Sequence, residues 1–568
     1  MAFVLATGTP NGASAADEAL RGVAQRPNIL LIVADDLGYS DIGAFGGEIH
    51  TPTLDALARQ GLRMTQFYVA PTCSPTRAML MSGVDSHRAG LGAMAETMVP
   101  EQRGKPGYEG YLNENVVAFP ELLRDAGYHT YMTGKWHLGQ SEAQSPAARG
   151  FEQSYVLTQG AANHFGQRGI ASADPKTVPK AMYRENGKLV DVPADFYSSN
   201  FFAQKMLSYI DSNRDGKPFF GYLAFTAPHW PLQAPDAYIR KYEGKYDVGY
   251  DVIRAQRLER MKALGIVPRD MDSYAGNARW PKWSELTPAQ RQSESRRVAV
   301  YAAMVEAMDA EIGRVVEHLK QTGQYDNTLI FFMSDNGADG NSILDEPAGL
   351  GWVRDHTDNS LANLGRADSF VEYGPGWGQV SMTPMKLYKA FANEGGIASP
   401  AIAVAPRRVR ASQLSQAPAH VTDVAPTILE LAGVQRPAGG YKGRSVLAMT
   451  GTSMLAFLSG QQDAVHAGEF LAGWELNGRK ALRKGDWKIV SANPPWGNGA
   501  WQLYNLRNDR AEQRDVARQH PAKLKELIAD YEVYQRDNGV QDVPGLAGRK
   551  GYSNGDSYYA DEGISARR

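Results

Sequence analysis

One pentapeptide, Cys73-Ser74-Pro75-Thr76-Arg77, combines residue types that could attack a substrate and bind an anion. Cys73 is the only cysteine among 568 residues, so it has no disulfide partner within the chain. The Ser-Pro pair predicts a helix N-cap and first turn, which places Cys73 just before a helix. There, unpaired N–H groups and the positive end of the helix dipole favour an anion, and Arg77 follows one turn later on the same face. The stretch predicts a nucleophile beside an oxyanion site, although a lone thiol is more often a buried small hydrophobe.

Oxygen ligands follow two apolar runs of the chain, residues 28–34 and 329–333. These ligands are Asp35, Asp36, Asp335 and Asn336. Apolar runs without alternation fit strands buried on both faces of a parallel sheet, and ligands bind at the carboxyl ends of such strands. Adjacent carboxylates repel each other unless a cation lies between them, although a solvated acidic turn is the alternative. Because the set contains only oxygen donors, it suits Ca²⁺ or Mg²⁺ better than zinc.

Basic side chains follow two further predicted strands. Lys135 and His137 lie between two glycines after the strand at 129–133, and we expect both to point to the same side of an extended segment. His229 follows the apolar strand at 219–225, in Ala-Pro-His-Trp-Pro. A single lysine or histidine is more often structural or exposed, so these three are candidates only as members of one site.

The elements that must position these side chains indicate an α/β protein. Residues 298–319 place apolar side chains at helical spacing, which we interpret as core and not as a binding stripe. We expect a large mixed, mostly parallel sheet sandwiched by helices. Further helices are predicted at 53–60, 120–126 and 201–212, and a further strand at 63–69.

The chain is long enough for more than one unit. From about residue 465, short alternating segments predict a smaller C-terminal antiparallel sheet with a helix at 521–534. Residues 241–288 read as a helical insertion, and 338–384 as a long irregular loop that shapes the pocket. The expected organisation is a leader or signal remnant at 1–26, a catalytic domain at 27–464, a small α+β subdomain at 465–545 and a tail at 546–568.

The composition is that of an ordinary globular protein, with 43% hydrophobic and 21% charged residues. The 60 basic and 62 acidic residues leave a net charge of −2, which argues against nucleic acid or a membrane surface as a partner. No apolar run approaches the roughly 18 residues that span a bilayer. Residues 13–16 resemble the end of a signal peptide, so we expect a periplasmic or secreted protein. Because the residues before them include no basic n-region, a cytoplasmic protein is the alternative.

The pentapeptide and several other motifs resemble those of the type I sulfatases. Cys-x-Pro-x-Arg followed by the apolar stretch 78–83 is similar to the family signature, and Gly-Lys-Trp-His-Leu-Gly at 134–139 matches a second family motif. The resemblance extends from about residue 27 to 540. Three stretches are similar to bacterial arylsulfatases in particular, at 107–112, 227–235 and 373–377.

This resemblance implies an alkaline-phosphatase-like fold and a modified nucleophile. In the family, a separate maturation enzyme oxidises the cysteine to Cα-formylglycine, and the hydrated form of that aldehyde attacks the substrate. The implied metal ligands are Asp35, Asp36, Cys73, Asp335 and Asn336. Members of the family that resemble this chain use calcium, so we expect Ca²⁺ rather than Mg²⁺.

The catalytic set implied by the resemblance is Cys73, Arg77, Lys135, His137, His229 and Lys389. His229 protonates the departing oxygen, while Lys135, His229 and Lys389 contact the substrate. His137 takes the proton of the second hydroxyl, so that sulfate leaves and the aldehyde is regenerated. The family has a lysine five residues before a Glu-Gly-Gly sequence, which in this chain is Lys389 and not Lys386.

The expected function is hydrolysis of small sulfate esters, in particular aryl sulfates. Phosphodiesterases and phosphonate monoester hydrolases of the same superfamily are an alternative, because two lysines and an arginine also suit a phosphoryl group. An alkyl sulfate is an alternative substrate. A protein that binds sulfated ligands without turnover is a remote alternative, because binding alone requires no hydrated aldehyde.

Overall fold

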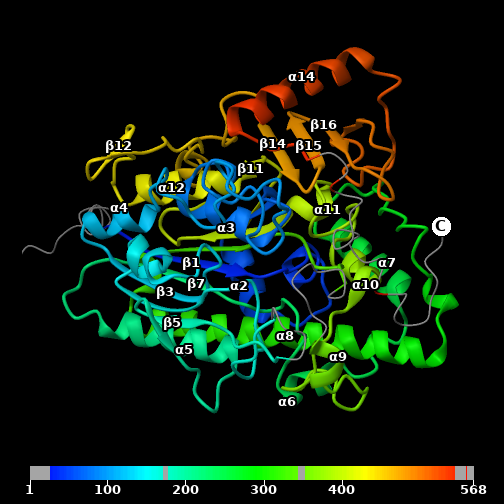
Figure 1. Cartoon of the computed structure of the whole chain (residues 1–568), viewed down its shortest axis with the longest axis horizontal. Helices are drawn as coiled ribbons and strands as arrows, with labels where there is room; N and C mark the ends of the chain where they lie inside the picture. The colour runs from blue at the N-terminus through cyan, green and yellow to red at the C-terminus, as the bar shows by residue number, and fades with distance from the viewer. Residues whose placement is uncertain (1–25, 171–176, 343–351, 544–545, 547–557, 559–568) are drawn as a thin grey trace, which may run out of the picture.

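The computed structural model describes residues 26–170, 177–342, 352–543, 546 and 558, and its centre is an eleven-stranded sheet (Figure 1). The strand order is β10-β2-β9-β8-β1-β7-β3-β4-β5-β6, and β11 pairs with β2. Six strand pairs are parallel and four are antiparallel, so the predicted mixed, mostly parallel sheet is confirmed. The strands are β1 (Asn28–Ala34), β2 (Leu62–Tyr68), β3 (His129–Lys135), β4 (Gln153–Leu157), β5 (Tyr183–Glu185), β6 (Lys188–Val190), β7 (Phe219–Ala224), β8 (Thr328–Ser334), β9 (Ala398–Val404), β10 (Gln413–Ser415) and β11 (Ala419–His420).

Helices cover both faces of this sheet (Figure 1). On one face lie α2 (Pro52–Gln60), α5 (Ser198–Ser212), α6 (Asp236–Ile239), α7 (Tyr250–Ala263), α8 (Pro288–Gln321) and α10 (Gly374–Ser381). On the other lie α3 (Cys73–Ser82), α4 (Phe119–Asp125), α12 (Val424–Leu431) and α13 (Leu455–Leu458). Leu30 and Ile32 of β1 pack into the first layer, whereas Ile29 and Leu31 pack into the second. This two-sided burial explains why the sequence of β1 shows no alternation.

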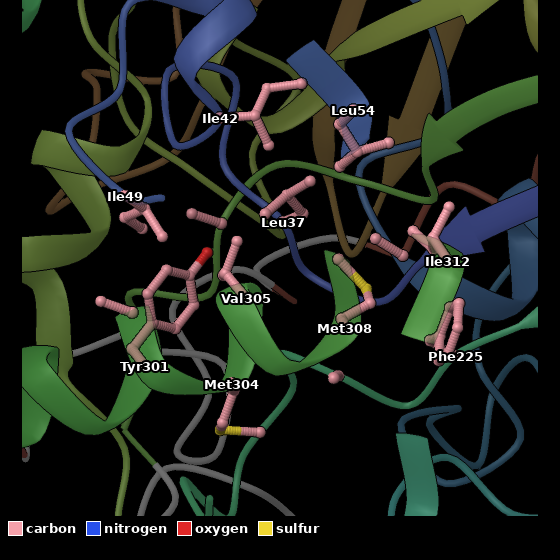
Figure 2. Close-up of a cluster of buried hydrophobic side chains, with 14 of the residues drawn as sticks. Leu37, Ile42, Ile49, Leu54, Phe225, Tyr301, Met304, Val305, Met308 and Ile312 are labelled. Carbon is pink, nitrogen blue, oxygen red and sulfur yellow. The ribbon is translucent and has the colours of Figure 1, made fainter. Parts of the chain in front are cut away.

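Helix α8 packs apolar side chains beneath the loop that follows β1, as Figure 2 shows for Val305 and Met308 on the side of Leu37. The interpretation of residues 298–319 as core is confirmed, since the predicted apolar positions are all buried. The hydroxyl of Tyr301 also accepts from Gly38 N (3.3 Å) and so contributes to the shape of that loop.

A second, four-stranded antiparallel sheet follows in the chain, with β14 (Leu471–Leu476), β15 (Arg479–Lys484), β16 (Trp487–Ser491) and β17 (Gln502–Asn505). Helix α14 (Pro521–Asn538) packs on one of its faces through the buried Leu527 and Tyr531. The expected smaller sheet with one helix is therefore confirmed, with β14 as a strand that the sequence did not predict. A boundary at residue 465 stays a prediction.

Three local expectations differ from the structure. The helix begins at Cys73 itself with Thr72 as its N-cap, so Ser74 is not the cap. The stretch 338–384 is not wholly irregular, because α10 and α9 (Trp352–His356) form within it. His137 has a left-handed backbone (φ +57°) because β3 ends at Lys135, so the argument that both side chains share one side of an extended segment was wrong.

The predicted leader (1–26) and tail (546–568) lie almost wholly outside the described residues. In the part of the chain that the structure describes, no helix is both long and apolar enough to cross a membrane.

Candidate active site

The strands β8, β1, β7 and β3 are neighbours, run parallel and end at one edge of the central sheet. The register pairs Ala34 of β1 with Ser334 of β8, the last residue of each strand. The acidic residues that follow the two strands therefore emerge side by side. The backbone N–H of Asp35 also donates to Ala227 O (3.1 Å), which brings in the loop that carries His229.

The four predicted oxygen-ligand residues converge into one fully buried group. Asn336 Nδ2 donates to Asp36 Oδ1 (2.6 Å), and the backbone N–H of Asp36 donates to Asp335 Oδ1 (3.3 Å). Burial raises the pKa of Asp35, and the adjacent carboxylates of Asp335 and Asp36 add to this effect against the attraction of Lys135. The site thus concentrates negative charge away from water, where it requires compensating cations.

Two buried cations supply part of that compensation. Lys135 Nζ donates to both oxygens of Asp35 (2.9 and 2.8 Å). Arg77 donates from Nε to Asp335 Oδ2 (2.9 Å) and from Nη1 to Lys135 O (2.7 Å). Burial disfavours the charged form of Asp335, but Arg77 and Lys135 outweigh it and lower its pKa to about 2. Arg77 therefore holds the carboxylate of Asp335 in the candidate site.

The negative charge and the unpaired oxygen that remain in the site suit a divalent cation. Asn336 Oδ1 is buried and has no hydrogen-bond partner among the described residues. Ligand atoms of Asp35, Asp36, Cys73 and His229 lie within 4.8 Å of one another, and all four residues are buried. A hard cation bound by the carboxylate oxygens and by Asn336 Oδ1 would give that amide oxygen a partner and would offset the carboxylate charge. Asp35, Asp36 and Cys73 of the predicted ligand set therefore fit a metal together. His229 belongs to the same group, whereas Asp335 does not.

Cys73 begins α3 and points its thiol at the acidic group, with Sγ 3.6 Å from Asp35 Oδ1 and 3.8 Å from Asp36 Oδ1. Its exposed fraction is 1%. Burial raises the pKa of the thiol well above its usual value, despite the attraction of Lys135 and Lys389. An unmodified Cys73 is therefore a protonated thiol and a poor nucleophile.

Lys389 and His229 meet at Oδ2 of Asp36. Lys389 Nζ lies 2.9 Å from Asp36 Oδ2, 3.0 Å from Asp339 Oδ2 and 3.3 Å from His229 Nε2. His229 Nδ1 lies 2.6 Å from Trp230 O and must carry a proton to make this bond, which leaves Nε2 facing the cluster. Burial and the positive charge of Lys389 lower the pKa of His229 well below its usual value. Lys386, the rejected alternative, packs instead between the rings of two tyrosines.

His137 contacts a carboxylate that the sequence did not single out. Its Nε2 lies 2.7 Å from Glu96 Oε1, whereas its Nδ1 is buried with no hydrogen-bond partner among the described residues. Burial lowers the pKa of His137 although Glu96 opposes this. Glu96 and Asp339 are thus two residues of the candidate site that sequence reasoning missed. Glu96 lies in no motif, and Asp339 lies four residues after Asp335 in a stretch read only as loop.

Known proteins that resemble this chain are sulfatases. A family model described as Sulfatase matches residues 27–434. The chain is 44% identical over 531 residues to an uncharacterized sulfatase of Schizosaccharomyces pombe, covering 92% of this chain and 95% of the relative. It is 41% identical over 437 residues to an arylsulfatase of Klebsiella aerogenes, covering 76% of this chain and 92% of the relative.

Solved structures share the fold. The structure of Ps i-CgsB in complex with k-i-k-neocarrahexaose aligns with a TM-score of 0.63 and 27% identity over 90% of this chain and 94% of that one. A sulfatase from Pseudoalteromonas sp. aligns with a TM-score of 0.60 and 23% identity, over 92% and 95% of the two chains. The chain therefore belongs to the sulfatase family, whose members hydrolyse sulfate esters.

Proposed function

We propose that this sulfuric ester hydrolase acts on aryl sulfates through an aldehyde residue made from Cys73. The arylsulfatase relative supports the choice of an aryl substrate. The single observation that carries the modified nucleophile is the buried, protonated Cys73 thiol at the centre of an otherwise complete site. A thiol in that state reacts poorly, whereas a hydrated aldehyde at position 73 would supply one hydroxyl as the nucleophile and a second for product release.

Asp35, Asp36, Asp335, Asn336 and residue 73 would hold Ca²⁺. When bound, the ion supplies Lewis-acid chemistry that lowers the pKa of a coordinated hydroxyl and screens charge at the reacting sulfur. Calcium is preferred over magnesium because the members of the family that resemble this chain use it.

Lys135 and Lys389 would bind the sulfate oxygens and orient the ester for in-line attack. The ammonium group of Lys135 contacts Asp35, and that of Lys389 contacts Asp36. His229 Nε2 would give its proton to the departing phenol oxygen, because Nδ1 is committed to Trp230 O. A low pKa makes the protonated form of His229 a strong acid, and a bound sulfate anion would favour that form.

His137 would accept the proton of the second hydroxyl at residue 73. Glu96 contacts Nε2, which selects the tautomer with a proton there and leaves the Nδ1 lone pair available as the base. Removal of that proton releases sulfate and restores the aldehyde. Arg77 would hold Asp335 and the end of β3 in place through the bonds described above.

A separate maturation enzyme would be needed, and it would act before folding is complete because Cys73 is buried. We further propose a periplasmic or secreted location, on the small-residue stretch at 13–16.

The test is the mass of the tryptic peptide that contains residue 73, paired with a chromogenic aryl-sulfate assay. Conversion to formylglycine with calcium-dependent turnover, lost in Cys73→Ala, supports the proposal. Full conversion with turnover of phosphate diesters alone would move the protein to the phosphodiesterase alternative. If the cysteine is unmodified, the assay is repeated after coexpression with a formylglycine-generating enzyme, and inactivity of the converted protein then refutes the proposal.

A further inference from the structure

The loop of residues 386–394, which carries Lys389, has an unfavourable backbone. Leu387 (φ +62°) and Ala390 (φ +74°) both lie in the left-handed region, although neither is glycine. On its inner side the loop is tied to the active site, since Lys389 N donates to Ala338 O (3.0 Å) and Ala390 N to Pro71 O (2.7 Å). Residues in such conformations persist only when their surroundings hold them, so the position of Lys389 depends on the contacts of this loop.

On its outer side the loop is held by the C-terminal subdomain, here meaning β14–β17, α14 and their connections. Arg479 of β15 donates from Nη1 to Ala390 O (3.1 Å), directly after Lys389. Its guanidinium also lies over the ring of Phe391, 4.6 Å from the centroid. One arginine thus contacts both the backbone and a side chain of the strained segment.

The end of the loop is bound by Glu512, which follows β17. Its Oε2 accepts from Asn393 Nδ2 (2.9 Å) and from the backbone N–H of Glu394 (3.0 Å). Lys488 Nζ of β16 lies 3.0 Å from Glu394 Oε1 and 2.9 Å from Glu512 Oε1, and all three side chains are fully buried. Glu512 therefore supplies the acceptor for both N–H groups and is itself held by Lys488, so its loss would remove the acceptor that binds the end of the loop.

We propose that Glu512, together with Lys488 and Arg479, is a positioning residue for catalysis that acts through Lys389. These three residues hold the loop so that Lys389 Nζ stays within reach of Asp36 and Asp339. From that position the ammonium group would bind sulfate. The C-terminal subdomain is then a working part of the active site, although none of the candidate site residues described above belongs to it. The inference rests on the proposed role of Lys389 in sulfate binding.

The experiment measures KM for an aryl sulfate and the inhibition constant of inorganic sulfate in the converted enzyme, because neither constant depends on the fraction of folded protein. Glu512→Ala should raise both about 10-fold, within the range expected for coupling through a packed network. Glu512→Gln keeps an acceptor oxygen for the two N–H groups, so it should raise them less. In a Lys389→Ala background, Glu512→Ala should add almost nothing.

A structural role alone would give a different pattern. Leu527→Ala removes a buried side chain of the same subdomain and should lower the melting temperature without changing KM. Glu526→Gln, at a surface pair of α14, should change neither. The proposal is overturned if Glu512→Ala changes only the melting temperature, or if its effect multiplies that of Lys389→Ala. If the converted wild-type protein shows no turnover, the proposed function fails, and calorimetric binding of inorganic sulfate to the same variants still tests this inference.

Discussion

Replacing Lys389 by alanine tests the assignment of the second sulfate-binding lysine, with Lys386→Ala as a matched control. The two lysines lie three residues apart on one loop, but only Lys389 reaches the acidic group, at 2.9 Å from Asp36 Oδ2. Lys386 lies 5.7 Å from the ring centroid of Tyr274 and 5.8 Å from that of Tyr504. Comparing the two variants therefore distinguishes the effect of losing a substrate contact from the effect of removing any lysine from this loop.

The magnitude follows from the contact that is lost. A hydrogen bond to a charged group contributes about 1.5–3 kcal/mol, which corresponds to roughly a 10- to 150-fold fall in kcat/KM. The ammonium also lowers the pKa of His229, after the larger effect of burial. Lys389→Ala should therefore raise the pKa of His229. If His229 acts as the acid, as we propose, the alkaline limb of the pH–rate profile should move to higher pH.

Steady-state kinetics of an aryl sulfate across a range of pH measures both effects. We expect Lys386→Ala to keep kcat/KM within about twofold of wild type, because a partly exposed cation–π contact is worth about 0.5–1 kcal/mol and lies away from the substrate. Equal losses in the two variants would refute the reasoning, as would a Lys389→Ala enzyme with unchanged kcat/KM.

Three further predictions concern other groups. Glu96→Gln removes a charge that raises the pKa of His137, so the acid limb of the pH–rate profile should move to lower pH and kcat should fall; an unmoved limb would contradict the assignment of His137 as the base. Burial opposes protonation of His87, but its bonds to Asp85 and Glu475 raise its pKa to about 9, above the unfolded value of about 6.5. Its stabilisation, about 3 kcal/mol, is therefore fully present below pH 6.5 and lost as pH rises through 9, and urea unfolding of wild type and His87→Gln from pH 6 to 10 should converge at the alkaline end. Chelation of calcium should abolish turnover and lower the melting temperature, with recovery on adding Ca²⁺; full activity in chelator would rule out the metal.

The strands that carry the acidic residues of the site were predictable because strands buried on both faces have apolar sequences. Strands β1 and β8 are buried on both faces, so their sequences are apolar without interruption, and polar residues can start only where the strands end. That contrast locates Asp35 and Asp335 without any knowledge of the fold. The helix after Cys73 was predicted from its Ser-Pro pair, with the cap placed at Ser74, two residues after the true cap at Thr72.

The partners of the site residues were not predictable in the same way. Glu96 and Asp339 lie in irregular segments, and nothing in their neighbouring residues distinguishes them from solvated carboxylates. The strained loop around Lys389 and its attachment to Glu512 join residues more than 100 positions apart. Such contacts depend on how the two sheets pack, and local sequence carries no record of that packing.

The sequence by itself determined the chemistry: a single cysteine before a helix, oxygen ligands after two buried strands, and lysines and histidines in motifs that resemble those of sulfatases. The tertiary structure decided the pairings. In it Lys135 pairs with Asp35, and Lys389 pairs with Asp36. His137 contacts Glu96, and Asn336 Oδ1 has no hydrogen-bond partner among the described residues. The physical reason is that residue types and strand ends are local properties of the chain, whereas distances between buried charges arise only when parallel strands align in register.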